Sequence, residues 1–338
     1  MGRTFNQLRD AATPLSSLSR TPNEFPPRLP PRDRTRRNTY CKTKLFGIPL
    51  WFFWTLLLIA ILALILPVAI MFGKKKRQVG PPTVLVPLYI YPDPGAWDPL
   101  FSAVEKYPKI NFTIIINPNS GPEGLDGNYT RDIPPLNFYP NVRTVGYVST
   151  NYTNRNFSLV EGDIRTYASW AGNASMLGMG MRGIFLDEVV SGWSDAAANF
   201  YAILAAVIRD ETGLGRDPLI IHNPGTLPDA RYLTSRSSNV TVIFENSWDN
   251  YNAVDLRASI RTLRKTAGVG REALAAIIYD VPDGEPDVES TNGDNKGTVV
   301  GNLRNVVGSL YLTGSGVGGD IYAGFWTRWG DWVEQMAS

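Results

Sequence analysis

The sequence predicts an α/β fold, a (β/α)8 barrel of the TIM type, preceded by a single transmembrane helix. Two observations carry this prediction. Eight short apolar runs alternate with amphipathic segments over the last three quarters of the chain, as parallel strands with right-handed helical crossovers do. Before them, residues 45–73 form a 29-residue stretch without a charged side chain. The chain is therefore expected to have a membrane-embedded part and a large globular body.

Composition and charge divide the chain into four segments. Residues 1–44 are rich in Pro, Arg, Ser and Thr and cannot bury a core, so they are expected to form a disordered basic tail. Residues 45–73 form the predicted span, residues 74–81 a basic Pro-Gly linker, and residues 82–338 the barrel. Residues 1–77 carry 14 Lys/Arg and 3 Asp/Glu, whereas residues 78–338 carry 19 and 28.

The apolar stretch is long enough to cross a bilayer, which needs about 20 helical residues. Four aromatic residues, Trp51–Trp54, stand at one end as an interfacial belt would. Four basic residues, Lys74–Arg77, close the other end. A signal peptide is a poorer interpretation, because the run is too long and some 45 polar residues precede it. We therefore expect contact with membrane lipid through a single span.

The flanks of the span indicate its orientation. More basic residues precede the span than follow it, which places the N-terminus in the cytoplasm. All candidate N-glycosylation sequons follow the span, as expected for a body on the secretory side. The acceptors are Asn111, Asn128, Asn151, Asn156, Asn173 and Asn239. The sequence thus predicts a type II membrane glycoprotein with its body at the cell surface.

The body contains eight predicted strands and six predicted helices. The strands are expected at 83–91, 111–117, 141–149, 181–188, 217–223, 239–245, 274–280 and 308–313. The helices are expected at 97–107, 158–171, 195–212, 253–267, 298–307 and 329–336. The body has the usual length of a (β/α)8 barrel. A doubly wound open sheet is the alternative, but no G-x-G-x-x-G or Walker A motif follows the first strand.

The rarity of Cys and His limits the chemistry. The single Cys excludes an internal disulfide, and the single His excludes a histidine-cluster metal site. We therefore expect neither metal nor cofactor, although an all-oxygen cation site stays open. The acidic body also argues against nucleic acid as a partner, because phosphate would be repelled. It would suit a neutral or cationic ligand. Nothing in the sequence specifies the oligomeric state.

Carboxylates directly follow several apolar strands. In a barrel, chemistry is located at the carboxyl ends of the strands, and a charge beside an apolar run is costly to desolvate. Asp187 and Glu188 end the fourth strand, and Glu245 ends the sixth. Because adjacent strand residues alternate in direction, one of the first two should enter the mouth and the other should point to a loop or helix. Two facing carboxyls are what glycoside hydrolysis requires.

Other strand-end residues are candidates for binding a substrate. Aromatic rings could stack on sugar faces, and amides could bond hydroxyl groups. The candidates are Tyr91, Asn117, Tyr147, His222, Asn223, Trp248 and Asp280. Each has an ordinary structural interpretation beside this one: Asp280 as a helix cap or ion-pair partner, His222 as a buried structural residue, and the aromatic residues as core or rim.

Four strings in the body resemble the spherulin 4-like, or spherulation-specific, family of fungi. They are Val-Pro-Leu-Tyr-Ile-Tyr-Pro (86–92), Ile-Ile-Asn-Pro-Asn-Ser-Gly-Pro (115–122), Gly-Ile-Phe-Leu-Asp-Glu (183–188) and Phe-Glu-Asn-Ser (244–247). The resemblance covers roughly residues 82–335. It implies a (β/α)8 glycoside hydrolase acting on galactosaminogalactan, an α-1,4-linked polymer of galactose, galactosamine and N-acetylgalactosamine. It also implies functional carboxylates at Asp187, Glu188 and Glu245.

The expected function is therefore a membrane-anchored, endo-acting glycoside hydrolase with a polysaccharide substrate. One alternative is a carbohydrate-binding or cell-wall structural protein that kept the barrel without catalysis. A nucleotide-dependent oxidoreductase is a weaker alternative, because the phosphate loop is missing.

Overall fold

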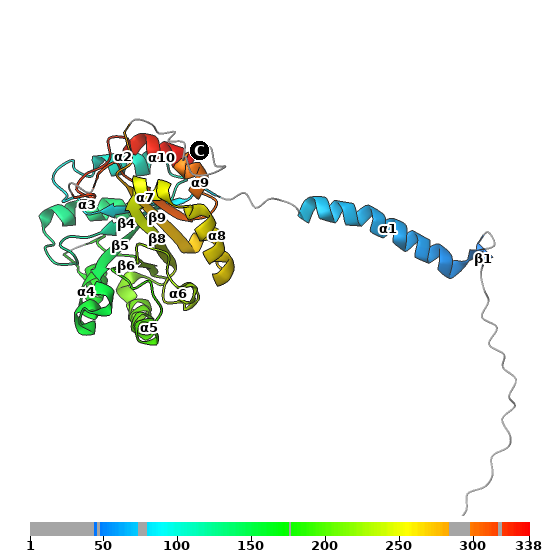
Figure 1. Cartoon of the computed structure of the whole chain (residues 1–338), viewed down its shortest axis with the longest axis horizontal. Coiled ribbons are helices and arrows are strands. Elements are labelled where there is room, and N and C mark those ends of the chain that lie inside the picture. The colour runs from blue at the N-terminus through cyan, green and yellow to red at the C-terminus, as the bar shows by residue number, and fades with distance from the viewer. Residues whose placement is uncertain (1–43, 46–47, 74–79, 176, 284–297, 317–319) are drawn as a thin grey trace, which may run out of the picture. The chain divides into compact units, whose positions relative to one another are not determined.

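The chain forms two compact units, residues 1–76 and residues 77–338. The computed structural model describes residues 44–45, 48–73, 80–175, 177–283, 298–316 and 320–338. The basic tail, apart from Lys44, and most of the 74–81 linker lie outside these described residues. Figure 1 shows the second unit as a ring of helices around a strand barrel.

The first unit contains a short hairpin and one long helix. Strands β1 (Lys44–Leu45) and β2 (Ile48–Pro49) pair antiparallel. Helix α1 (Leu50–Gly73) follows directly. Within the described part of the chain, we find no helix with both the length and the apolar character needed to span a bilayer. The predicted span over residues 45–73 stays a prediction.

Eight parallel strands close into a barrel, which confirms the predicted (β/α)8 barrel and excludes the open sheet. The strand order is β10-β3-β4-β5-β6-β7-β8-β9. The strands are β3 (Thr83–Leu88), β4 (Phe112–Ile116), β5 (Val142–Ser149), β6 (Gly183–Asp187), β7 (Leu219–His222), β8 (Val240–Ser247), β9 (Leu274–Tyr279) and β10 (Ser309–Leu312). Most strand residues are buried, because barrel side chains cover one face and helices cover the other.

Helices follow the strands on the outside of the barrel (Figure 1). They are α2 (Asp98–Lys106), α3 (Gly127–Phe138), α4 (Phe157–Ser169), α5 (Asp195–Asp210), α6 (Ala230–Thr234), α7 (Trp248–Ala253), α8 (Leu256–Ala267), α9 (Val299–Leu303) and α10 (Trp329–Ala337). Short 3₁₀ turns lie at Asn151–Thr153, Trp170–Gly172, Thr212–Leu214 and Arg271–Ala273.

Helix α3 was not expected from the sequence. It contains Pro134 and Pro135, and proline normally predicts a break because it lacks the N–H that a helix interior needs. The Asp126 side chain begins the helix by accepting hydrogen bonds from the backbone N–H groups of Asn128 and Tyr129. Tertiary packing of its buried face then outweighs the weak propensity.

Strand β5 shows which positions face the barrel interior. Thr144 donates a hydrogen bond to Asn137 of α3, and Gly146 lies against the Tyr167 ring of α4, so these even positions face the helices. The odd positions, which include Arg143 and Tyr147, therefore face inward. This alternation determines which strand-end residues meet at the mouth.

The predicted glycosylation acceptors all lie at least partly at the surface. Asn111, Asn151, Asn156, Asn173 and Asn239 are exposed, whereas Asn128 is half-buried. The Asn156 side chain accepts a hydrogen bond from the Ser158 N–H and so caps α4. Their modification stays a prediction.

Candidate active site

Side chains from three adjacent strands meet at the carboxyl end of the barrel. Asp187 ends β6, Asn223 follows β7, and Glu245 lies near the end of β8. The Asn223 amide nitrogen donates to Asp187 Oδ1 at 2.8 Å and to Glu245 Oε2 at 2.5 Å. Since one nitrogen bonds both, these two carboxylate oxygens lie no farther apart than the two bonds together, 5.3 Å.

Two tyrosines complete what we term the carboxylate cluster: Asp187, Asn223, Glu245, Tyr147 and Tyr322. The Tyr147 hydroxyl donates to Asp187 Oδ2 at 2.7 Å. The Tyr322 hydroxyl, from the segment between β10 and α10, donates to Glu245 Oε1. Each carboxylate therefore accepts one phenolic hydrogen and one amide hydrogen.

Burial governs the protonation of both carboxylates. It raises the pKa of Asp187, as the nearby Glu188 charge also does, while the bonds from Tyr147 and Asn223 oppose the rise. Burial likewise raises the pKa of Glu245, against the bonds from Tyr322 and Asn223, and the Asp187 charge adds to the rise. A raised pKa favours the protonated form of each carboxyl, which is the form that a general acid needs.

Glu188 departs from the alternation expected of strand residues. Its φ of 53° turns the backbone out of strand geometry directly after Asp187. Its carboxylate accepts a hydrogen bond from the Ser149 hydroxyl, and Ser149 shares the inward face of β5 with Tyr147. The expectation that one of the pair would point to a loop or helix is therefore wrong, because both carboxylates bond inward-facing residues of the same strand.

The backbone around Glu188 is held by several hydrogen bonds. The Thr150 hydroxyl donates to the carbonyl oxygens of Asp187 and Glu188, both at 2.9 Å. The Tyr152 N–H donates to the Glu188 carbonyl at 2.7 Å. A non-glycine residue in the left-handed region is strained and needs such support, and strain of this kind often occurs at functional sites.

Aromatic residues adjoin the cluster on one side. The Tyr89 ring lies edge-on to Tyr147 at 5.6 Å and to Tyr322 at 5.0 Å between ring centroids. Tyr89, Ser149 and Tyr322 were not among the predicted site residues. The two-residue period of inward positions could have identified Tyr89 and Ser149, whereas Tyr322 lies in a connecting segment with no periodic signal.

His222 lies away from the mouth. It precedes the inward-facing Asn223 and so faces the helices, where its ring lies 5.1 Å from Tyr201 of α5. It is buried, and no hydrogen-bond partner for its Nε2 is found in the described part of the chain. Burial lowers its pKa to about 3, so it is neutral at physiological pH. This is the structural role that the sequence analysis left open.

Among the residues that the structure describes, the other predicted binding residues form no hydrogen bond with the carboxylate cluster. Tyr91 is exposed and donates to Asp126. Asn117 accepts from the Gly121 N–H at 2.9 Å and so shapes the loop after β4. Trp248 is buried against Tyr251.

Asp280 is exposed at the end of β9, with a φ of 59°. Within the described residues, no group of three or more His, Cys, Asp or Glu side chains is arranged to hold a metal ion.

Comparison with known proteins identifies the body. The family model of spherulation-specific family 4 matches residues 83–336. Spherulin-4 of Physarum polycephalum is 38% identical over 226 residues, which are 66% of this chain and 60% of that protein. The chain thus matches less than two thirds of that relative's length.

A solved structure of Aspergillus clavatus Sph3 in complex with GalNAc is similar at 39% identity and a TM-score of 0.69. The match covers 77% of this chain and 99% of that one. These findings confirm the resemblance seen in the sequence: the chain belongs to spherulation-specific family 4.

Proposed function

We propose that this chain is a glycoside hydrolase that cleaves a polysaccharide containing galactosamine or N-acetylgalactosamine. The observation that carries the proposal is the pairing of Asp187 and Glu245 through Asn223, with both carboxyls raised in pKa by burial. Glycosidic cleavage needs one carboxyl to protonate the leaving oxygen and a second as nucleophile or base. The GalNAc-bound relative supports a hexosamine substrate.

We further propose an endo-acting enzyme on an α-1,4-linked polymer resembling galactosaminogalactan. Residues 78–338 carry nine more acidic than basic side chains. Unacetylated galactosamine units are cationic, so this excess of negative charge would favour their approach.

The spacing of Asp187 and Glu245 supports hydrolysis with retention of anomeric configuration. Retaining enzymes hold their carboxyls about 5–5.5 Å apart, whereas inverting enzymes need about 6.5–9.5 Å to admit a water. Asp187 Oδ1 and Glu245 Oε2 are within 5.3 Å, the two Asn223 bonds together. Proton NMR of the first product formed would show the starting anomer; the opposite anomer would contradict this pairing.

Amide substitution tests the assignment. Asp187→Asn, Glu188→Gln and Glu245→Gln preserve shape but remove the proton. Glu245→Gln and at least one of the other two should lower turnover by about 10²–10⁴, the usual contribution of a general acid–base group. Polymer binding should persist, because the aromatic and amide contacts remain.

The matched control is Glu334→Gln, since Glu334 also accepts a tyrosine hydroxyl, that of Tyr107, but far from the mouth. Turnover of this control should equal that of the parent. If all three site variants hydrolyse polymer at the parent rate, the catalytic carboxyls lie elsewhere. If the parent binds polymer without ever cleaving it, the protein is a carbohydrate-binding module on the same barrel.

We also propose that the body is held at the cell surface by the apolar segment 45–73 as a type II membrane protein. The charge-free length of that segment and the sequons confined to residues after it support this topology. Enzymatic removal of N-glycans should increase the mobility of the body, and alkaline carbonate should leave the full chain in the membrane pellet. Release into the supernatant would exclude a span.

A further inference from the structure

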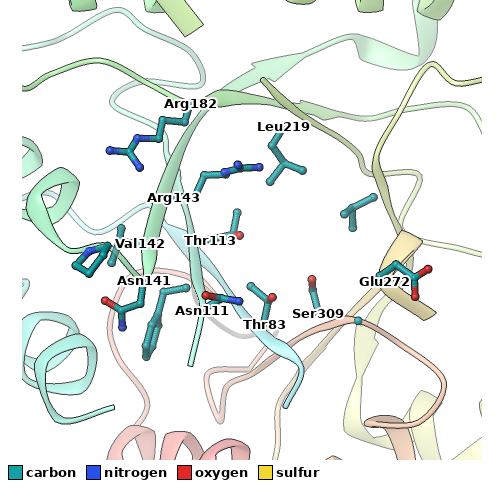
Figure 2. A pocket seen from close by; sticks show the side chains of 14 residues that line it. Thr83, Asn111, Thr113, Asn141, Val142, Arg143, Arg182, Leu219, Glu272 and Ser309 are labelled. Carbon is teal, nitrogen blue, oxygen red and sulfur yellow. The ribbon is translucent and has the colours of Figure 1, made fainter. Parts of the chain in front are cut away.

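A cavity of about 370 Å³ opens at the amino-terminal end of the barrel, opposite the carboxylate cluster. Figure 2 shows the side chains from the starts of the strands around it. Thr83, Thr113 and Ser309 line it with hydroxyl groups, and Leu219 and Val240 give it an apolar side. We call it the floor cavity. None of the residues that carry the proposed hydrolysis lines this cavity.

Arg143 extends into the floor cavity from the second residue of β5 (Figure 2). Strand register places it beside Thr113 of β4, on the inward face that also carries Tyr147. The side chain is half-buried. Across the described residues, no carboxylate lies within ion-pair distance of Arg143, and its guanidinium donates no hydrogen bond. A half-buried guanidinium without a partner among the described residues keeps its N–H donors available to an anion.

The rest of the lining favours an anion. Arg182 lies at the rim, and within the part of the chain that the structure describes its guanidinium donates one long bond, at 3.4 Å, to the Asn137 carbonyl. Glu272 is the one acidic residue of the lining, and Figure 2 shows it on the far side of the cavity from Arg143 and Arg182. The lining therefore carries two positive side chains and one negative side chain, so its net charge is positive.

We propose that the floor cavity binds a phosphate group. The planar guanidinium of Arg143 offers paired donors that match two phosphate oxygens. Thr83, Thr113 and Ser309 can donate to the remaining oxygens. A carboxylate has only two oxygens and would leave several of these donors unused, so a tetrahedral oxyanion fits the donor set better.

The floor cavity also lies where the chain enters the barrel. The Arg271 guanidinium donates to the Gly80 carbonyl at 2.5 Å, and the Thr83 N–H donates to the Gly308 carbonyl at 2.8 Å. Gly80 is seven residues beyond the end of α1 at Gly73. The phosphate could belong to a soluble ester or to a lipid headgroup, and the test must separate these sources.

The test is calorimetric titration of the full chain in an uncharged detergent. The probes are inorganic phosphate, glycerol phosphate and a short-chain phosphatidic acid below its micelle concentration, with acetate at equal ionic strength as the carboxylate probe. The parent should bind phosphate with saturable 1:1 stoichiometry. Tighter binding of the phosphatidic acid than of glycerol phosphate identifies a lipid headgroup; equal binding identifies a soluble phosphate.

Three variants make the test specific. Arg143→Gln should weaken phosphate binding at least about tenfold, the effect of losing one charge-assisted hydrogen bond. Arg182→Gln, a rim substitution that leaves the interior unchanged, should weaken it severalfold. Arg261→Gln alters an exposed arginine of α8 and should bind as the parent does.

Three results would overturn the proposal: no saturable heat from phosphate at millimolar concentration, equal affinities in all variants, or tighter binding of acetate than of phosphate. The hydrolase assignment is tested separately, because Arg143→Gln and Arg182→Gln should leave turnover unchanged at the opposite end of the barrel.

Discussion

Tyr322 shows how a single hydroxyl sets the chemistry of a buried carboxylate. Its bond to Glu245 favours the ionised form and so opposes the rise in pKa that burial causes. Tyr147 has the same relation to Asp187. These two phenols therefore keep the pKa values of the carboxylates closer to their ordinary range than burial alone would.

We predict that Tyr322→Phe raises the pKa of Glu245 further. Whether Glu245 acts as acid or as base, the limb of the pH–rate profile that it controls should move to higher pH, by about one pH unit for a bond of about 1.4 kcal/mol. If Glu245 must be ionised, as a base or nucleophile, turnover on the acidic side of the shifted limb should fall by up to about tenfold; if it is the acid, turnover should extend to higher pH. Tyr107→Phe, which removes a hydroxyl bonded to the remote Glu334, should leave the profile unchanged. An unmoved profile in Tyr322→Phe would contradict the role given to this bond.

His222 should make the fold sensitive to acid. Its pKa is about 3 in the folded chain and about 6.5 in an unfolded one. Below pH 6.5 the unfolded state binds a proton at His222 that the folded state does not bind. The free energy of unfolding therefore falls as the pH falls from 6.5 towards 3. The loss is about 1.4 kcal/mol per pH unit within that window.

We predict that His222→Gln reduces this loss. Urea denaturation at pH 7 and pH 5 should show a smaller drop in the free energy of unfolding for the variant than for the parent. Other titrating groups act on both proteins and cancel in the comparison. An equal drop would mean that His222 is protonated in the fold.

Among the elements, the strands were easier to predict than the connections. Every residue of β4 is buried, and all but Thr113 are apolar, a pattern set by burial on two faces. Helix α3 was missed because its two prolines contradict local propensity. Closure of the barrel depends on the pairing of β10 with β3. These are the last and the first strand of the barrel, and in the sequence only the number of predicted strands indicates that they pair.

Close packing between strands gives an element-scale prediction at Gly183. A Cβ there would lie 2.1 Å from the Leu219 carbonyl oxygen of β7, and a backbone atom cannot move aside as a flexible side chain can. Gly183→Ala should lower the free energy of unfolding by at least about 2 kcal/mol, as overpacking does.

The matched control for Gly183→Ala is Gly162→Ala, in α4, where an added Cβ meets nothing within 4 Å. Alanine is the better helix former, so this change should stabilise the protein by about 0.5–1 kcal/mol. Urea midpoints measured for both variants test the pair. Equal effects of the two substitutions would mean that β6 and β7 can separate at this point.

At the scale of the whole molecule, the site residues that lie at strand ends could be predicted from the sequence. Those that reach the site from loops could not. Asp187 and Glu245 were identifiable because each ends an apolar run, and parallel strand ends meet at one mouth. The bridge through Asn223 depends on the exact register of β6, β7 and β8, which the sequence leaves open. Tyr322 reaches the mouth from a segment without periodicity.

The division of the chain into two units gives the last prediction. Residues 77–338 contain the complete barrel, and the family match begins only at residue 83. Deletion of residues 1–76 should therefore leave Tm and polymer turnover unchanged. Deletion through Leu88 removes β3 and exposes the edges of β4 and β10, so it should give aggregated protein. The measurements are thermal unfolding by circular dichroism and product release. A shorter deletion that already lowers Tm by several degrees would show that the first unit stabilises the barrel.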